Sequence, residues 1–154
     1  AWGLSNPNVR LIIVRTGIVL GLNGGMVPRL LPLFKLGLGG RIASGKQRMS
    51  FIHIDDLVSA FHFFIENTAT SGVYNLVAPI ASTNAQFTSE LAKLLKRQAP
   101  FAIPGFILRI AFGSMSEMLT KGEYVYPERL LAEGFQFKFR EIGSALQDLI
   151  SSNR

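Results

Sequence analysis

The segment Val9–Val14 (VRLIIV) places the strongest constraint on how this chain can fold. Five of its six residues are apolar and β-branched side chains dominate, which is typical of a strand buried on both faces in a parallel sheet. Parallel neighbours are joined by long crossover connections, and the residues before Val9 are too few to supply one. We therefore expect an α/β chain that forms the C-terminal part of a larger protein.

Composition narrows the classes of partner. With 48% hydrophobic and 17% charged residues the chain is globular, and the lack of cysteine excludes disulfides, thiolate catalysis and cysteine zinc sites in this segment. The net charge of +6 is compatible with nucleic acid or with a small anionic ligand. Basic residues are scattered without interleaved aromatics, and no apolar run is long enough to span a membrane. We therefore expect a small anionic ligand, and neither nucleic acid nor a membrane as partner.

Periodicity predicts mainly helices with a few short strands. A helix over Met26–Leu36 should be kinked or start late because of Pro32, and Asp55 should be the N-cap of the next one. Thr83 and Gln86 match a capping box. The apolar face after Asp55 would comprise Leu57, Val58, Phe61, Phe64 and Ile65. Further helices are predicted over Pro104–Leu119, from Pro127 to Gly134 and around Ile142–Ile150, and strands over Arg48–Ile54, Gly72–Val77 and Phe135–Phe139.

Several motifs suggest chemistry but fit structural roles better. Residues 40–47 (GRIASGKQ) nearly match a phosphate-binding loop, but Gln47 replaces the magnesium-binding hydroxyl, so we expect a turn that presents Lys46 and Arg48 to solvent or a ligand. His53 could join its neighbouring aspartates in a metal site, yet a strand histidine before a helix start is more often structural, and no metal is expected. The chain contains neither a G-x-G-x-x-G fingerprint nor a Tyr-x-x-x-Lys pair. We therefore assign no catalytic residue to this segment.

A series of motifs in a fixed order carries a resemblance. The series comprises Arg15–Gly21 (RTGIVLG), Leu31–Gly40 (LPLFKLGLGG), Met49–Leu57 (MSFIHIDDL), Tyr74–Pro79 (YNLVAP) and Gly134–Phe137 (GFQF). It resembles the C-terminal half of an epimerase-like family, related to sugar-nucleotide epimerases, within the extended short-chain dehydrogenase/reductase superfamily. The resemblance extends over nearly the whole chain.

This resemblance implies an NAD(P)-binding Rossmann-type α/β fold. Residues 1–99 would contain the last core strand and the substrate-side lobe, with mostly helical structure and few short strands. Residues 100–154 would form a small C-terminal domain specific to the family. The N-terminal part, which would bind most of the NADP or NAD cofactor and hold the catalytic residues, would be missing from this chain.

The resemblance also implies two groups of site residues. Arg15, Thr16, Gly17 and Ile18 would lie next to the nicotinamide and contact it through backbone groups, although Gly17 could equally be a simple strand-end turn. Lys46, Gln47 and Arg48 would meet the diphosphate of a substrate. Arg48 departs from the family, which tends to have Trp at this position.

Three functions remain open from the sequence. The chain would be the substrate-side part of an NAD(P)-dependent epimerase or oxidoreductase acting on a nucleotide-sugar-like or other small anionic substrate. The alternative is a non-catalytic binding or regulatory protein with the same fold, and a nucleic-acid binder is the third. We expect a cytoplasmic protein, with organellar targeting left open. We also expect exposed apolar surface along Val9–Val14, or a homodimer that covers it.

Overall fold

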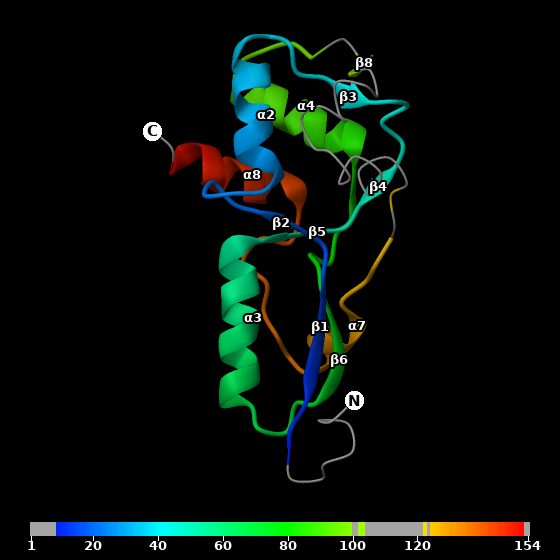
Figure 1. Cartoon of the computed structure of the whole chain (residues 1–154), viewed down its shortest axis with the longest axis vertical. Helices are drawn as coiled ribbons and strands as arrows, with labels where there is room; N and C mark the ends of the chain where they lie inside the picture. Colours follow the sequence, from blue (N-terminus) through cyan, green and yellow to red (C-terminus); the bar gives the residue numbers. More distant parts are fainter. Residues whose placement is uncertain (1–8, 100–101, 104–121, 123, 153–154) are drawn as a thin grey trace.

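The computed structural model describes residues 9–99, 102–103, 122 and 124–152 and has an α/β fold, as predicted (Figure 1). The helices are α2 (Met26–Lys35), α3 (Ile54–Glu66), α4 (Asn84–Leu94), α7 (Glu128–Ala132) and α8 (Ile142–Ser151). The strands are β1 (Ile12–Thr16), β2 (Ile18–Leu20), β3 (Arg41–Ile42), β4 (Arg48–Met49), β5 (Phe51–His53), β6 (Gly72–Leu76), β7 (Ser82–Thr83) and β8 (Ala102–Ile103). They form four two-stranded sheets, of which only β4–β7 is antiparallel.

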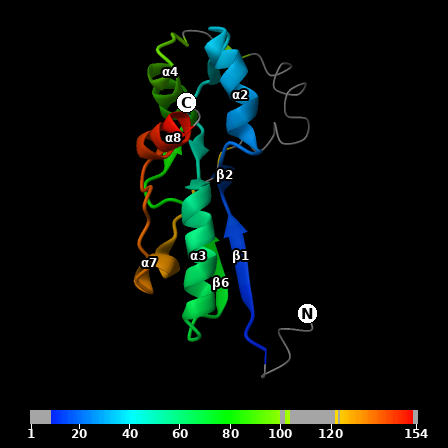
Figure 2. The same cartoon turned by 90° about the vertical axis from the view of Figure 1, so that its left-hand side faces the viewer.

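The first sheet pairs β1 with β6 in parallel, from Ile12 opposite Gly72 to Thr16 opposite Leu76. One face packs on α3, where Tyr74 and Leu76 join Phe64 in a buried cluster (Figure 2). The Tyr74 hydroxyl donates to the Glu133 carboxylate at 2.7 Å, which ties β6 to the turn after α7. Burial, together with this contact, raises the pKa of Tyr74. Burial of an aromatic with a satisfied hydroxyl makes this contact a stable anchor for α7.

The other face of the first sheet is open among the described residues. Ile13 and Val73 stand opposite each other on it and are 39% and 40% exposed. Isolated exposed apolar residues are normal, but parallel strands are ordinarily covered on both faces. This exposure agrees with the expected apolar surface along Val9–Val14, although the strand begins only at Ile12.

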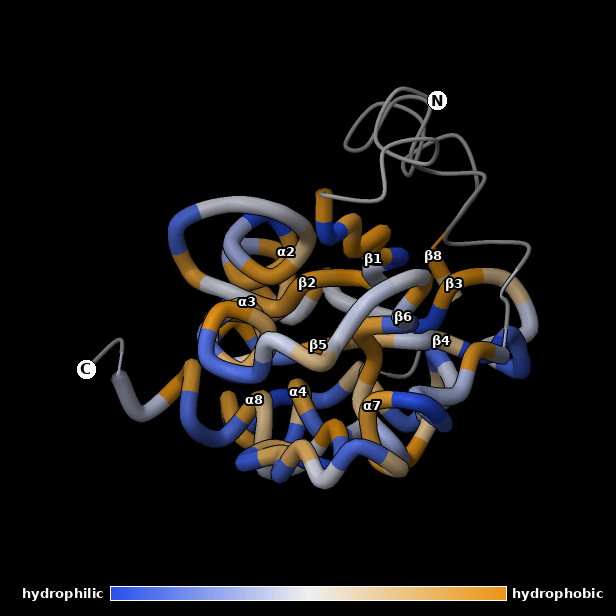
Figure 3. Tube along the Cα trace, turned by 90° about the horizontal axis from the view of Figure 1, so that it is seen from below, coloured by the Kyte–Doolittle hydropathy of each residue, from blue (hydrophilic) through white to orange (hydrophobic). Residues whose placement is uncertain are grey.

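The second part of the molecule surrounds β2 and β5. Seen along the long axis, these strands lie between α2 on one side and α4 with α8 on the other (Figure 3). The larger core cluster is formed here by residues such as Leu20, Phe34, Phe51, Phe87 and Leu146. Burial of so many large side chains makes this region the main source of stability in the chain.

The start of α3 differs from the sequence prediction. The N-cap is His53 rather than Asp55, and its Nδ1 accepts the backbone N–H of Asp55 at 3.1 Å. Asp56 lies in the first turn as expected but is buried, and its two oxygens accept the backbone N–H groups of Lys138 and Phe139 at 2.8 and 2.9 Å. These bonds explain why the predicted strand over Phe135–Phe139 is absent, since its donors are used by a side chain instead of a neighbouring strand.

The apolar face predicted for α3 is only partly buried. Leu57 is partly buried and Phe64 fully buried against the first sheet, but Val58, Phe61 and Ile65 are 48%, 45% and 69% exposed. Ile54 is 38% exposed as well, so the four form a partly exposed apolar stripe at helical spacing. We refer to Ile54, Val58, Phe61 and Ile65 as the α3 stripe.

The remaining predicted helices and strands are partly confirmed. The capping box of Thr83 and Gln86 is present, α7 follows Pro127 and precedes Gly134 (φ +88°), and α8 has the expected amphipathic face. However, α2 begins at Met26 without delay and contains Pro32, and the strand predicted over 48–54 is divided into β4 and β5. The helix predicted over Pro104–Leu119 lies outside the described residues. Within the described ranges, every helix is too short or too polar to cross a bilayer.

The buried His53 predicts a pH-dependent stability. Burial lowers its pKa below the ordinary value of 6.5, although three nearby carboxylates oppose the shift. The charged groups that face it are Asp55, Asp56, Lys138 and Asp148. Because the unfolded chain binds this proton more readily, the free energy of unfolding should fall as pH drops through 6.5, by at most about 1.4 kcal/mol per pH unit, and level off below the folded-state pKa.

The measurement is urea denaturation of the full-length protein between pH 5 and 8. His53→Asn keeps an acceptor for the helix cap and should flatten this part of the profile, whatever its effect on absolute stability. His62→Asn is the matched control, because His62 is exposed on α3. An unchanged slope in His53→Asn would show that His53 does not titrate as the structure implies.

Candidate functional site

The candidate site starts at Gly17, where the chain changes partners. The Gly17 N–H donates to the Leu76 carbonyl at 3.2 Å, which ends the β1–β6 pairing, and the Ile18 N–H donates to the Ser50 carbonyl at 2.9 Å, which begins the β2–β5 pairing. A Cβ atom at Gly17 would lie 2.5 Å from the Ser50 carbonyl oxygen. Only glycine fits this close approach of two backbones.

This geometry limits how residues 15–18 can contact a ligand. The N–H groups of Gly17 and Ile18 are already used inside the protein, so they cannot donate to a cofactor. The side chains of Arg15 and Thr16 are exposed at the carboxyl end of β1. In parallel α/β sheets this end of the strands is where ligands bind.

The second group of predicted site residues lies in the turn after β3 and at the start of β4. The turn is held by the start of α4, since the N–H groups of Asn84 and Ala85 donate to the carbonyls of Gln47 and Gly45 at 3.0 and 2.9 Å. Gly45 has a φ of +71°, which favours glycine. The motif 40–47 thus forms a turn followed by β4, as predicted, and not a phosphate-binding loop that opens a helix.

The three candidates in this turn differ in what they can offer. The Gln47 amide donates to the Ile42 carbonyl at 3.0 Å, so this side chain supports the turn. Lys46 is exposed, and the Arg48 guanidinium lies 5.0 Å above the ring of Tyr124. Such stacking leaves the guanidinium edge able to bind an anion while the ring fixes its orientation.

Ser50 brings the two groups together. Its carbonyl accepts from Ile18, and its hydroxyl accepts the Val125 N–H at 3.0 Å. Residues 124–126 therefore pass next to the carboxyl ends of β1 and β6. Here Asn75, near the end of β6, donates to the Tyr126 carbonyl at 3.3 Å. The sequence reasoning missed Tyr124, Ser50 and Asn75, because no local pattern indicates that residues so far apart along the chain meet here.

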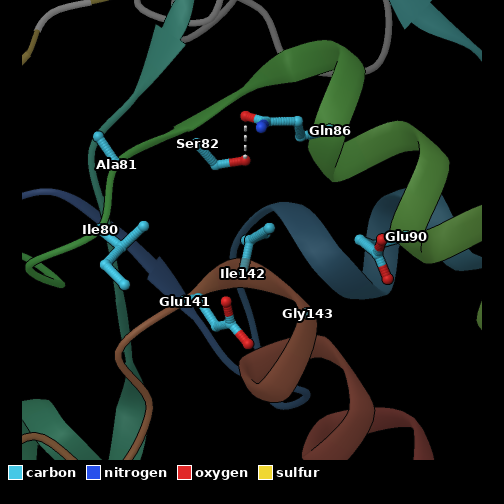
Figure 4. Close-up of a pocket in the computed structure, with 8 residues that line it drawn as sticks. All are labelled: Ile80, Ala81, Ser82, Gln86, Glu90, Glu141, Ile142 and Gly143. Carbon is cyan, nitrogen blue, oxygen red and sulfur yellow. Dashed lines mark hydrogen bonds between the residues drawn. The ribbon is translucent and has the colours of Figure 1, made fainter.

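A separate cavity of about 260 Å³ lies between the loop before β7, α4 and the start of α8 (Figure 4). Glu90 and Glu141 line it, and its Ser82 hydroxyl donates to the Gln86 amide oxygen at 3.5 Å. Among the residues that the structure describes, no cation lines this cavity. Two carboxylates would repel a phosphate or a dinucleotide, so this cavity is not the predicted site.

The His53 cluster also lacks the features of a metal site. His53, Asp55 and Asp148 could bring three ligand atoms within 4.8 Å of one another. The Nδ1 lone pair is occupied by the Asp55 N–H, so the neutral ring carries its proton on Nε2. Within the described part of the chain Nε2 has no hydrogen-bond partner, and it lies 3.6 Å from an Asp148 oxygen. A metal on Nδ1 would have to break the hydrogen bond from the Asp55 N–H, and a metal on Nε2 would have to replace the ring proton. Both favour a structural role for His53.

Comparisons with known proteins agree with this fold. Residues 1–77 match the NAD dependent epimerase/dehydratase family, and residues 103–149 match a domain of unknown function, DUF1731. The epimerase family protein SDR39U1 of Mus musculus is 40% identical over 149 residues, which are 96% of this chain and 51% of that protein. Epimerase family protein Mb2239 of Mycobacterium bovis is 42% identical over 138 residues, 89% of this chain and 46% of that protein.

Solved structures extend the likeness. The crystal structure of human epimerase family protein SDR39U1 (isoform 2) with NADPH has a TM-score of 0.87 and 37% identity, covering 95% of this chain and 50% of that one. UDP-N-acetylglucosamine 4-epimerase from Bacillus cereus has a TM-score of 0.74 at 12% identity, covering 97% and 49%, which shows a shared fold alone.

These matches cover one part of longer proteins, since the chain spans about half the length of the curated relatives it matches. The family predicted from the motif series is confirmed by the family model, and the Rossmann-type α/β fold by the structural neighbours. The chain belongs to the NAD dependent epimerase/dehydratase family, with the DUF1731 domain at its C-terminal end.

Proposed function

We propose that this chain is the substrate-side half of an NAD(P)-dependent epimerase-like or oxidoreductase-like enzyme that acts on a nucleotide-sugar-like or other small anionic substrate. The observation that carries the proposal is the joint at Ser50, which binds both the segment after β1 and the C-terminal segment. This joint supports the proposal that Arg15, Lys46 and Arg48 serve one site near the carboxyl end of the first sheet.

The cofactor in this proposal is NADP or NAD, held mainly by a preceding part of the protein. Arg15 and Thr16 are suited to contact the nicotinamide end of the cofactor. Both side chains are exposed next to Gly17, where the backbone packs closely against Ser50. Human SDR39U1 was crystallised with NADPH, which supports NADP(H) as the first cofactor to test. When bound, the dinucleotide would supply hydride transfer, whereas residues 15–18 would position it.

The substrate would be anionic. Lys46 lies in a turn that Gln47 stiffens, and Arg48 begins the strand β4 after it, where Tyr124 orients its guanidinium. Arginine and lysine at these positions suit a diphosphate, for which charge-assisted bonds are strong. The structure of a Bordetella bronchiseptica enzyme, WbmG, in complex with NAD and UDP makes UDP a reasonable probe, although it is only 15% identical.

The domain organisation follows from the same reasoning. Residues 1–99 would complete a Rossmann sheet begun by the preceding part, and residues 100–154 would be the family-specific domain. The open face of the β1–β6 sheet and the α3 stripe would be covered by that preceding part. Phe63 lies on the flank of α3 that faces α7, because its ring contacts Phe135. The α3 stripe lies on the opposite flank of the helix, which faces β1 (Figure 2).

One prediction of this proposed function concerns binding of the dinucleotide. The full-length protein should bind NADPH or NADH saturably, and Thr16→Val should weaken this binding about three- to tenfold by removing one hydrogen bond. Thr68→Val is the matched control, because Thr68 is also exposed but lies in the loop that precedes β6, at the opposite end of the first sheet. Titration by calorimetry checks both.

Residues 1–154 alone, if circular dichroism shows them to be folded, should bind at least about tenfold more weakly than the full-length protein. Tight dinucleotide binding by this chain alone would contradict the proposed division of the site. If the full-length protein binds no dinucleotide, the non-catalytic alternative is favoured.

The second prediction concerns the anionic substrate. In the full-length protein, Lys46→Gln and Arg48→Gln should each weaken UDP binding about tenfold, which is the loss of one charge-assisted contact, and leave NADPH binding unchanged within about twofold. Lys35→Gln removes an equal charge from the end of α2 and should have little effect. Equal losses in all three variants would mean that only the overall charge matters.

A further inference from the structure

A basic cavity lies apart from the candidate substrate residues. It has a volume of about 570 Å³ and runs along α4 between β3 and the segment that leads into β8. Three cations line it, namely Arg41 from β3, Lys93 from the last turn of α4 and Arg97 after that helix. Lys46, Gln47 and Arg48 do not line it.

The three cations have no anionic partner among the described residues. Within the described residues, no acidic side chain lines the cavity, and Arg41, Lys93 and Arg97 take part in no ion pair and no side-chain hydrogen bond. Two other exposed cations are paired, Arg129 with Glu133 and Lys138 with Asp55. Converging unpaired cations create a positive potential that attracts an anion.

The floor of the cavity leaves room for a ligand. Ala85, Ser89 and Ala92 follow one another at helical spacing along this face of α4, and their small side chains keep the groove open. Ser89 and Gln98 add polar groups, whereas Thr88 is buried and its hydroxyl donates to the Gly40 carbonyl at 3.5 Å. The volume lies within the range of small-molecule sites.

A purely structural explanation accounts for part of this arrangement only. Lys93 lies at the C-terminal end of α4, where a cation offsets the helix dipole. Arg41 comes from a different element and has no such role. Two arginines and a lysine around one groove match the donors that recognise phosphate.

We propose that this cavity binds a phosphate-bearing ligand with at least two negative charges, such as a diphosphate, at a site separate from the Lys46–Arg48 turn. Arg41 and Arg97 hold phosphate oxygens from opposite sides of the groove, and Lys93 adds a third positive charge. The inference does not depend on the proposed epimerase-like function, because it uses none of the residues assigned to cofactor or substrate.

The test is calorimetric titration of the full-length protein with inorganic pyrophosphate at low salt and without NADPH, whose own phosphates would compete for the cavity. Arg41→Gln and Arg97→Gln should each weaken pyrophosphate binding about tenfold or more. Arg140→Gln removes the same charge from an exposed position away from the cavity and should change it by less than about twofold. Circular dichroism establishes that each variant is folded.

Four outcomes would overturn the proposal. They are absence of saturable pyrophosphate binding, an equal loss in Arg140→Gln, and a loss in Lys46→Gln with none in the two cavity variants. The fourth is binding of duplex DNA that is tighter than pyrophosphate binding and weakens steeply with salt, since this result would indicate a nucleic-acid surface.

Discussion

The close approach of Gly17 to Ser50 is the contact on which the arrangement of this chain depends. Within one residue the chain leaves β6 and pairs with β5, because no side chain separates the two backbones. The first sheet and the core around β2 are therefore joined by a short, rigid connection. A larger residue at this position would push Ser50 away and disturb its bonds to Ile18 and Val125. The same contact that organises the fold thus also assembles the candidate site.

A second constraint is that the first sheet is incomplete among the described residues. One face of β1–β6 is covered by α3, whereas the other exposes Ile13 and Val73. The α3 stripe adds further apolar surface on the β1 side. Burying such surface on both faces is what makes parallel sheets stable. A preceding half of the same protein would cover both, and the relatives are long enough to include one.

The elements with strong local signals could be predicted from the sequence. The capping box of Thr83 and Gln86 defined the start of α4, and the β-branched residues near Ile12 indicated a parallel strand. The prediction for α3 was less accurate because an apolar arc of five residues is wider than one neighbour can cover. Periodicity gives the width of such an arc and does not say which part a missing neighbour would bury.

Errors elsewhere came from long-range contacts. Alternating phenylalanines predicted a strand over Phe135–Phe139, but Asp56 accepts the N–H groups there. His53 replaces Asp55 as the N-cap since its ring is held against Phe139 at a centroid distance of 3.9 Å. In the candidate site, Lys46 and Arg48 could be identified from the motif alone. Their neighbour Tyr124 could not, because it is distant in the chain.

The most direct test of the account is amide hydrogen exchange in the full-length protein, measured along β1. Since Gly17 donates to Leu76, the alternation of a parallel ladder directs the N–H groups of Ile13 and Arg15 to β6 and those of Ile12, Val14 and Thr16 to the opposite edge. If a further strand pairs with that edge, Ile12, Val14 and Thr16 will be protected as strongly as Ile13 and Arg15. Rapid exchange at those three residues alone would show that β1 is an edge strand in the whole protein and would contradict the account.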